Sequence, residues 1–337
     1  MLKYGIVKPV FKAQLFRIVP LTVVSDSENL YRRQADLLVE LGYKDLGYVY
    51  VNIDDCWMEM QRDNLTDRLV ADKKRFPNGI KALADYVHQK GLKLGIYTDI
   101  GSKTCGGYPG TQDHYDIDAQ TLAEWEIDML KVDGCYANAS DFAVEYPALG
   151  RSLNNTGRPI LYSCSWPAYQ DDKDFPIIAG TSRKLMWQKD YVAIAEHCNI
   201  WRNWDDIEDS WASITSIAKY FGDRGDAMVP TAGPGNYHDP DMLVIGNYGL
   251  SCPEAQVQMS IWAILAAPLL ISADLQQVPP CHEAVLKNKD LIAANQDPLG
   301  MMGERVYKVS LAFTHSCKLG RKYSAALNQE LKYSIQL

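Results

Sequence analysis

Eight aspartates and two basic residues follow or end apolar runs along the chain, and their types indicate acid–base chemistry. They are Asp54, Asp55, Asp99, Asp133, Asp205, Asp206, Asp239 and Asp241, with Lys131 and Arg202. Clustered carboxylates can hold a metal ion, bind hydroxyl groups, or cleave a glycosidic bond with one ionised and one protonated acid. Buried charges are a poor source of stability, so we expect this group to serve a site.

The stretch DMLKVDGCYA, residues 128–137, decides between these chemistries. Lys131 and Asp133 are two residues apart in a predicted strand, so both side chains share a face, and the lysine keeps the carboxylate ionised. The same pairing disfavours a Schiff base at Lys131, which would need an uncharged amine. A metal is disfavoured because only His238, of six histidines, lies in these polar segments. We therefore favour sugar chemistry, with Asp206 across a cleft from Asp133 and no metal or cofactor.

Single residues in these segments have simpler explanations. Asp54, Asp205 and Asp239 could each cap a following helix, which is a common role for aspartate at a strand-to-helix junction. The nearby tryptophans are more typical of a core than of a sugar-stacking platform; they are Trp57, Trp166 and Trp204. The prediction of acid–base chemistry therefore depends on the whole group.

Seven apolar runs predict the strands that would carry these polar residues. They are 48–53, 92–97, 128–133, 159–163, 199–203, 227–230 and 268–272. Helical patterns lie between them, as at 78–91, where Asn78 is placed to cap a helix and Gly91 to end it. Nearly continuous apolar strands that alternate with helices are typical of parallel α/β folds.

Two α/β architectures fit this alternation, a doubly wound open sheet and a (β/α)8 TIM barrel. An open sheet concentrates its ligand groups at one switch point, whereas a barrel gathers them from nearly every strand onto one rim. Six of the predicted strands run directly into a polar cluster. The sequence therefore predicts a barrel with its site at the carboxyl-terminal rim.

Composition restricts the partners. The chain has 337 residues, a formal net charge of −8 and no basic stripe, which argues against a nucleic-acid partner. No run of 18 apolar residues occurs, so we expect no membrane span. Eight cysteines without a C-x-x-C pair favour structural disulfides over a zinc site. Sequons at Asn64, Asn138 and Asn154 are compatible with a secretory route.

Seven motifs together resemble glycoside hydrolase family 27, the animal lysosomal α-galactosidases and α-N-acetylgalactosaminidases. In order, they are NIDDCW, KGLKLGIYTDIGSKTC, LKVDGCY, RPILYSCSWPAY, WRNWDDIEDSW, AGPGNYHDPDMLVIGNYGLS and NQDPLG, within about residues 26–300. The resemblance implies an eight-stranded barrel followed by an antiparallel β domain, and a retaining double displacement.

The resemblance also assigns roles to residues. Asp133 matches the nucleophile and Asp206 the acid/base. Positions that match sugar-binding residues are Asp54, Asp55, Tyr97, Lys131, Arg202, Asp241 and Met242. Two disulfides are implied, Cys105–Cys135 and Cys164–Cys198.

Substrate preference is predicted from CSWPAY, residues 164–169. In this family a Glu and a Leu after strand five suit a hydroxyl on sugar carbon 2, whereas a Ser and an Ala leave room for an N-acetyl group. The chain has Ser165 and Ala168, with Tyr169 as a possible wall and Arg202 near the acetamide. We therefore expect cleavage of terminal α-linked N-acetylgalactosamine, and weaker cleavage of α-linked galactose.

The chain also departs from the family pattern. Residues 1–25 contain no tryptophan or cysteine, so the first strand is expected to be atypical and no signal peptide is evident. The segment between Tyr169 and Tyr191 is longer than usual and adjoins the specificity residues. We expect an atypical segment at 1–25, the catalytic barrel at 26–300, and a truncated C-terminal antiparallel β domain at 301–337.

Several functional alternatives remain open from the sequence. The resemblance implies a lysosomal or secreted homodimer that acts on glycolipids and glycoproteins. The chain could instead be an α-galactosidase proper, or a catalytically inactive homologue that binds carbohydrate.

Overall fold

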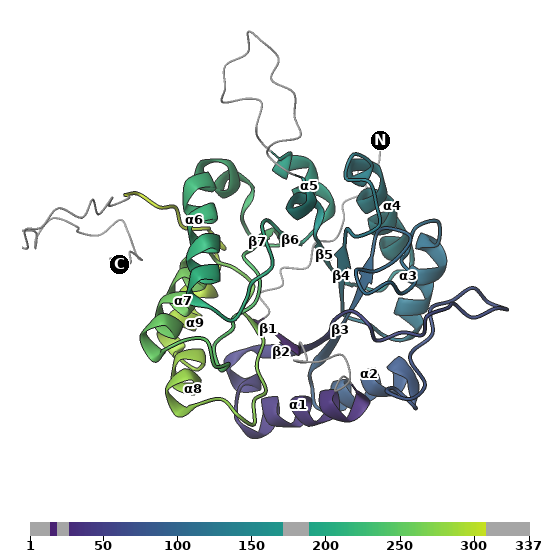
Figure 1. Ribbon diagram of the computed structural model, residues 1–337, viewed down its shortest axis with the longest axis horizontal. Helices are drawn as coiled ribbons and strands as arrows, with labels where there is room; N and C mark the ends of the chain where they lie inside the picture. The colour runs from purple at the N-terminus through teal and green to yellow at the C-terminus, as the bar shows by residue number, and fades with distance from the viewer. Residues whose placement is uncertain (1–13, 19–26, 171–188, 308–337) are drawn as a thin grey trace, which may run out of the picture.

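Parallel strands alternate with helices along the chain, and the helices surround the strands (Figure 1). The computed structural model describes residues 14–18, 27–170 and 189–307. The strands are β1 (Gln14–Ile18), β2 (Tyr48–Ile53), β3 (Lys93–Asp99), β4 (Met129–Asp133), β5 (Leu161–Cys164), β6 (Ile200–Arg202), β7 (Tyr237–Asp239) and β8 (Leu270–Ile271).

Nine α-helices occur in the described part of the chain. They are α1 (Glu28–Glu40), α2 (Gly79–Gln89), α3 (Tyr115–Glu124), α4 (Phe142–Asn155), α5 (Tyr191–His197), α6 (Trp211–Met228), α7 (Cys252–Ile264), α8 (Pro280–Leu286) and α9 (Lys289–Asn295). Among the described residues, no helix is long and apolar enough to cross a membrane.

The eight strands form one sheet in the order β7-β6-β5-β4-β3-β2-β1-β8. All of the strand pairs are parallel. Leu243, just after β7, closes the ring: its amide donates to the Leu270 carbonyl at 2.7 Å, and its carbonyl accepts from the Ser272 amide at 2.9 Å. The predicted TIM barrel is therefore confirmed.

The helix predicted at 78–91 shows how the sequence builds one barrel unit. α2 buries Ile80, Leu83, Ala84 and Val87, which recur at helical spacing, and Gly91 follows with a φ of +69°. Asn78 stands at the predicted N-cap position, but its side-chain oxygen accepts from no helix amide. Its side-chain amide instead donates to the Glu28 carboxylate at 3.1 Å.

The predicted strand at 227–230 is also wrong. Residues up to Met228 belong to α6, and a 3₁₀ turn follows at Val229–Thr231. The seventh strand is instead β7, inside the segment interpreted as a polar cluster. A strand of three residues is too short to show an apolar run, whereas AMVP continues the apolar face of α6.

The structure describes the first strand of the barrel but not most of the segment that follows the barrel. β1 occupies the first-strand position between β2 and β8, so the sheet begins before residue 26. Most of the segment expected to form a β domain, 308–337, lies outside the described residues, as does 171–188 of the longer connection before Tyr191. The domain limits stay predictions.

His238 in β7 joins three elements from a buried position. Its Nδ1 lies 2.9 Å from Trp201 Nε1, which donates, and its Nε2 lies 3.0 Å from the Met228 carbonyl oxygen. A neutral ring protonated at Nε2 satisfies both contacts. Burial lowers the pKa of His238 to about 3, and the hydrogen bond to Met228 opposes this only in part.

Acid should therefore destabilise the fold through His238. The unfolded chain binds a proton on this ring below about pH 6.5, whereas the folded chain does not until about pH 3. Between those values, His238 lowers the free energy of unfolding by about 1.4 kcal/mol for each unit by which the pH falls. We expect His238→Gln to lose stability less steeply than the wild type between pH 6.5 and 4.5, in urea unfolding at each pH. Equal slopes for the two proteins would contradict this.

Candidate active site

The candidate site lies where the strands end. β3 ends at Asp99, β4 at Asp133 and β6 at Arg202, and Asp54 follows β2 directly. Because all the strands run in parallel, these ends meet on one rim of the barrel. The rim carries the residues that the sequence predicted to act together.

Asp133 is held on both carboxylate oxygens. Tyr169 donates its hydroxyl to Oδ1 at 2.8 Å, and the amide of Gly134 approaches the same oxygen at 3.1 Å. Tyr97 donates its hydroxyl to Oδ2 at 3.1 Å. Two phenols, one from β3 and one from the turn after β5, therefore fix the orientation of this carboxylate.

The surroundings of Asp133 keep it ionised. Burial raises the pKa of its carboxyl group, but the positive charge of Lys131 and the Tyr169 hydrogen bond lower it. The charge of Arg202 and a hydrogen bond from the Ser165 side chain lower it further. Together these neighbours outweigh the effect of burial, so the pKa of Asp133 lies below its ordinary value. An ionised and oriented carboxylate is what a nucleophile requires.

Lys131 lies between the nucleophile candidate and the end of β2. Its Nζ is 3.4 Å from Asp54 Oδ2 and 5.1 Å from the centre of the Tyr97 ring. Asp55 is fixed separately, since its Oδ2 accepts from the Gly106 amide at 2.7 Å. Carboxylates and an ammonium group arranged in this way can bind several hydroxyl groups of a sugar.

Arg202 connects the two acids of the predicted pair. Its Nη2 donates to Asp206 Oδ1 at 2.8 Å and lies 3.0 Å from Asp241 Oδ2, while its charge acts on Asp133. The Asp206 side chain is 92% exposed, whereas that of Asp241 is 2% exposed. Asp206 is thus open to solvent and to a leaving group, and Asp241 holds Arg202 from within.

Asp241 also has a structural role that sequence reasoning did not detect. Its Oδ2 accepts from the Ile207 amide at 2.9 Å, and its carbonyl accepts from Trp262 Nε1 at 2.7 Å. Its φ is +76°, in the left-handed region where aspartate is tolerated. This residue therefore links the segments after β6 and β7 to α7.

The specificity residues occupy one short turn after β5. Ser165 is buried and Tyr169 ends a 3₁₀ turn, Trp166–Tyr169. The Ala168 amide donates to the Ser165 carbonyl at 3.0 Å, which closes the turn. Ser165 and Tyr169 contact Asp133 directly, and the Met242 amide donates to Asp241 Oδ1 at 2.9 Å.

The structure joins Cys105 to Cys135 and Cys164 to Cys198, the pairs that the resemblance implied, and also Cys252 to Cys281. The first of these disulfides borders the site. Its Cys105 sulfur lies 3.6 Å from Asp133 Oδ2.

Two groups of acidic, histidine or cysteine side chains come close enough together to resemble metal ligands in the described residues. In the first, Asp99 lies beside Cys105 and Cys135, but disulfide sulfurs are not thiolate ligands. The second is Asp85, His88 and Glu126 on the barrel exterior. Lys81 forms ion pairs with Asp85 and Glu126, and His88 pairs with Asp128 at 2.7 Å. An ion-pair network accounts for this second group.

Comparison with known proteins places this chain in a family. Residues 22–297 match the family described as alpha galactosidase A. The chain belongs to the alpha galactosidase A family. The predicted resemblance to glycoside hydrolase family 27 is thereby confirmed.

Relatives in the alpha galactosidase A family carry two names. The chain is 53% identical over 283 residues to an alpha-N-acetylgalactosaminidase of Gallus gallus, which covers 84% of this chain and 67% of the relative. It is 50% identical over 281 residues to alpha-galactosidase A of Homo sapiens, covering 82% and 62%. The chain thus spans about two thirds of the length of these relatives.

Solved structures in the alpha galactosidase A family agree with the fold. Alpha-galactosidase I from Mortierella vinacea superposes with a TM-score of 0.78 at 30% identity, over 91% of this chain and 78% of that one.

Proposed function

We propose that the chain is a retaining glycosidase that removes terminal α-linked N-acetylgalactosamine, and α-linked galactose more slowly. The observation that carries the proposal is the partly buried, ionised carboxylate of Asp133, which is near an arginine that also holds the exposed Asp206. One acid kept ionised and a second open to solvent match the two roles of a retaining mechanism.

The proposed reaction has two displacements. Asp133 attacks the anomeric carbon while Asp206 protonates the glycosidic oxygen, so the aglycone leaves as an alcohol and a glycosyl ester forms. Asp206 then takes a proton from water, whose oxygen attacks the anomeric carbon and releases Asp133. The two inversions leave the configuration retained. Asp54, Asp55, Tyr97, Lys131, Asp241 and Met242 would line the sugar.

Purified protein should hydrolyse p-nitrophenyl α-N-acetylgalactosaminide with a higher kcat/KM than the α-galactoside. Proton NMR of the first product should show the α-anomer, as retention requires. Faster turnover of the galactoside would favour an α-galactosidase proper. No turnover of either substrate by folded protein that still binds the sugar would favour an inactive carbohydrate-binding homologue.

Enlarging the specificity residues should reverse the preference. Ser165→Glu with Ala168→Leu fills the space proposed for the acetamide, so we expect kcat/KM for the N-acetylgalactosaminide to fall about 100-fold or more, while the galactoside is retained. Retained galactosidase activity is the internal control for an intact site. An equal loss on both substrates would contradict the assignment.

We also propose a secretory route with a lysosomal or extracellular destination, glycolipids and glycoproteins as substrates, and a homodimer. Three disulfides support an oxidising route. Asn64, Asn138 and Asn154 are all exposed, as glycan acceptors must be. Removal of N-glycans with a loss of mass would test the route, and light scattering during gel filtration would test the dimer.

A further inference from the structure

A second carboxyl group, that of Asp99, lies fully buried beside Asp133. The two residues end adjacent strands and are paired across them in the sheet register. Asp99 forms no salt bridge with any of the described residues, and the proposed reaction gives it no role. A buried carboxyl group without a cationic partner is costly, so its hydrogen bonds indicate its purpose.

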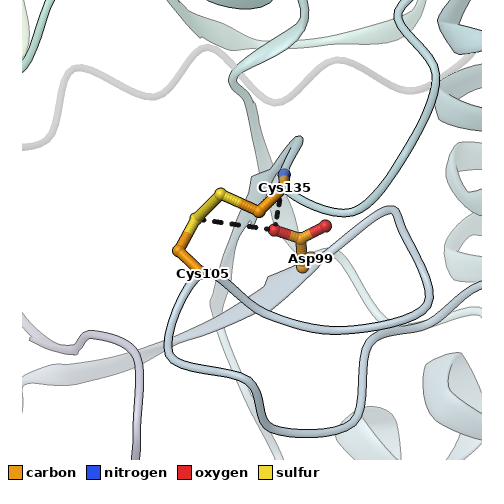
Figure 2. A group of neighbouring side chains, drawn as sticks. All are labelled: Asp99, Cys105 and Cys135. Carbon is orange, nitrogen blue, oxygen red and sulfur yellow. Dashed lines mark hydrogen bonds between the residues drawn. A yellow bond between two sulfur atoms is a disulfide. The ribbon is translucent and has the colours of Figure 1, made fainter.

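Both oxygens of Asp99 accept from the backbone of loops that leave the barrel. Oδ1 accepts from the Gly101 amide at 2.8 Å, and Oδ2 accepts from the Cys135 amide at 2.9 Å. Figure 2 shows the carboxylate directed at Cys135, with the Cys105–Cys135 disulfide beside it. One side chain therefore joins the loop after β3 to the loop after β4.

The two loops are in close contact at this point. A Cβ atom added to Gly101 would lie 2.2 Å from the Cys135 carbonyl oxygen, so only glycine permits the approach. The loop after β3 is also anchored behind Asp99, whose carbonyl accepts from the Thr111 amide at 2.9 Å and from its hydroxyl at 2.8 Å. The Asp99 contacts therefore belong to a closely packed, hydrogen-bonded assembly.

The disulfide that this assembly holds touches the groups that orient Asp133. The Cys135 sulfur lies 3.2 Å from the Tyr169 hydroxyl, and the Cys105 sulfur lies 3.5 Å from the Tyr97 hydroxyl. These are the two phenols that donate to Asp133. A shift of the disulfide would move both of them.

The charge state of Asp99 is compatible with its place beside the nucleophile. Burial is the main cause that raises the pKa of Asp99 to about 8. The negative charges of Asp133 and Asp55 also raise it, whereas the two amide hydrogen bonds oppose the shift. Below that pH the group is neutral, accepts from both amides, and adds no second negative charge beside Asp133.

We propose that Asp99 is a positioning residue, which clamps the amides of Gly101 and Cys135 and so holds the Cys105–Cys135 disulfide against the phenols that orient Asp133. The inference rests on the proposed function, because it concerns the same nucleophile. It gives a specific role to Asp99, which the sequence placed only in the group of aspartates expected to serve a site.

The test replaces Asp99 by asparagine, which keeps the shape but offers one acceptor and turns an N–H group toward the other amide. We expect kcat on the N-acetylgalactosaminide to fall about 10- to 100-fold with KM changed less than about 3-fold, since misplacement of about 1 Å has effects of this size. We also expect dithiothreitol to reduce the Cys105–Cys135 disulfide about 10-fold faster, as followed by alkylation and mass spectrometry.

A matched control is Asp118→Asn. Asp118 is also fully buried, but it lies on α3 and is held by Arg62 at 2.6 and 2.7 Å. This variant should lose stability while kcat and the reduction rate of the disulfide stay within about 2-fold of the wild type. Similar losses of kcat in both variants would assign the Asp99 effect to general destabilisation and overturn the proposal.

A second variant covers the case in which Asp99→Asn does not fold. Because Asp99 acts through the disulfide, Cys105→Ser with Cys135→Ser should lower kcat by a similar factor, and an unchanged kcat would overturn the proposal. Faster reduction without any glycosidase activity in the wild type would support the clamp while the proposed function fails. Lower kcat in Asp99→Asn at an unchanged reduction rate would overturn the clamp alone.

Discussion

Replacing Asp133 by asparagine should reduce kcat on the N-acetylgalactosaminide by about 10,000-fold or more, because the amide cannot form the glycosyl ester. Removal of a covalent nucleophile has effects of this order in other hydrolases. The fold should survive, since the Asn side chain can still accept from Tyr97 or Tyr169. The measurement is steady-state kinetics, with circular dichroism and thermal unfolding to confirm a folded sample.

Chemical rescue separates a lost nucleophile from a damaged site. In Asp133→Gly, sodium azide can enter the vacated space and attack the anomeric carbon directly, so we expect turnover to recover and the product to be the β-glycosyl azide. A single inversion gives that configuration. Residual activity near the wild-type level in Asp133→Asn would show that another residue is the nucleophile.

Replacing Asp206 by asparagine should have the second-largest effect, and the size should depend on the leaving group. General acid catalysis contributes about 100- to 10,000-fold, and a poor leaving group needs it most. We expect kcat/KM to fall toward the upper limit with an alkyl aglycone and far less with a dinitrophenyl aglycone. The ratio of the two losses measures the proton transfer specifically.

Asp205→Asn is the matched control for this experiment. Asp205 is the adjacent exposed aspartate. Its backbone carbonyl oxygen, and not its carboxylate, accepts from Arg202, at 3.1 Å. We expect near wild-type kinetics with both aglycones. If Asp205→Asn showed the leaving-group dependence and Asp206→Asn did not, the acid/base assignment would be wrong.

The barrel and its rim were predictable because parallel strands are apolar on both faces and end in polar residues. The run that became β2 was predicted with its observed limits, 48–53. β7 was misplaced because its three residues carry no period, and the apolar end of α6 imitated a strand. Short strands are fixed by their neighbours in the sheet, and that information is not local in sequence.

The candidate site was predictable where residue type alone limits the chemistry, and not where backbone geometry decides. Lys131 beside Asp133 indicated an ionised carboxylate before any coordinates, and the structure places both on the rim. The role inferred for Asp99 depends on two amides from distant loops, which no spacing reveals. An aspartate that receives only backbone N–H groups resembles any other strand-end aspartate in the sequence.

The closing contact between Leu243 and β8 has a consequence for biosynthesis. During translation β1 emerges first, but its outer partner, Leu270–Ile271, is made more than 250 residues later. Until then the nascent sheet has two open edges, at β1 and β7, and open edges invite pairing with other chains. The ring can therefore close only after its eighth strand has left the ribosome, and both edges stay open to other chains until then.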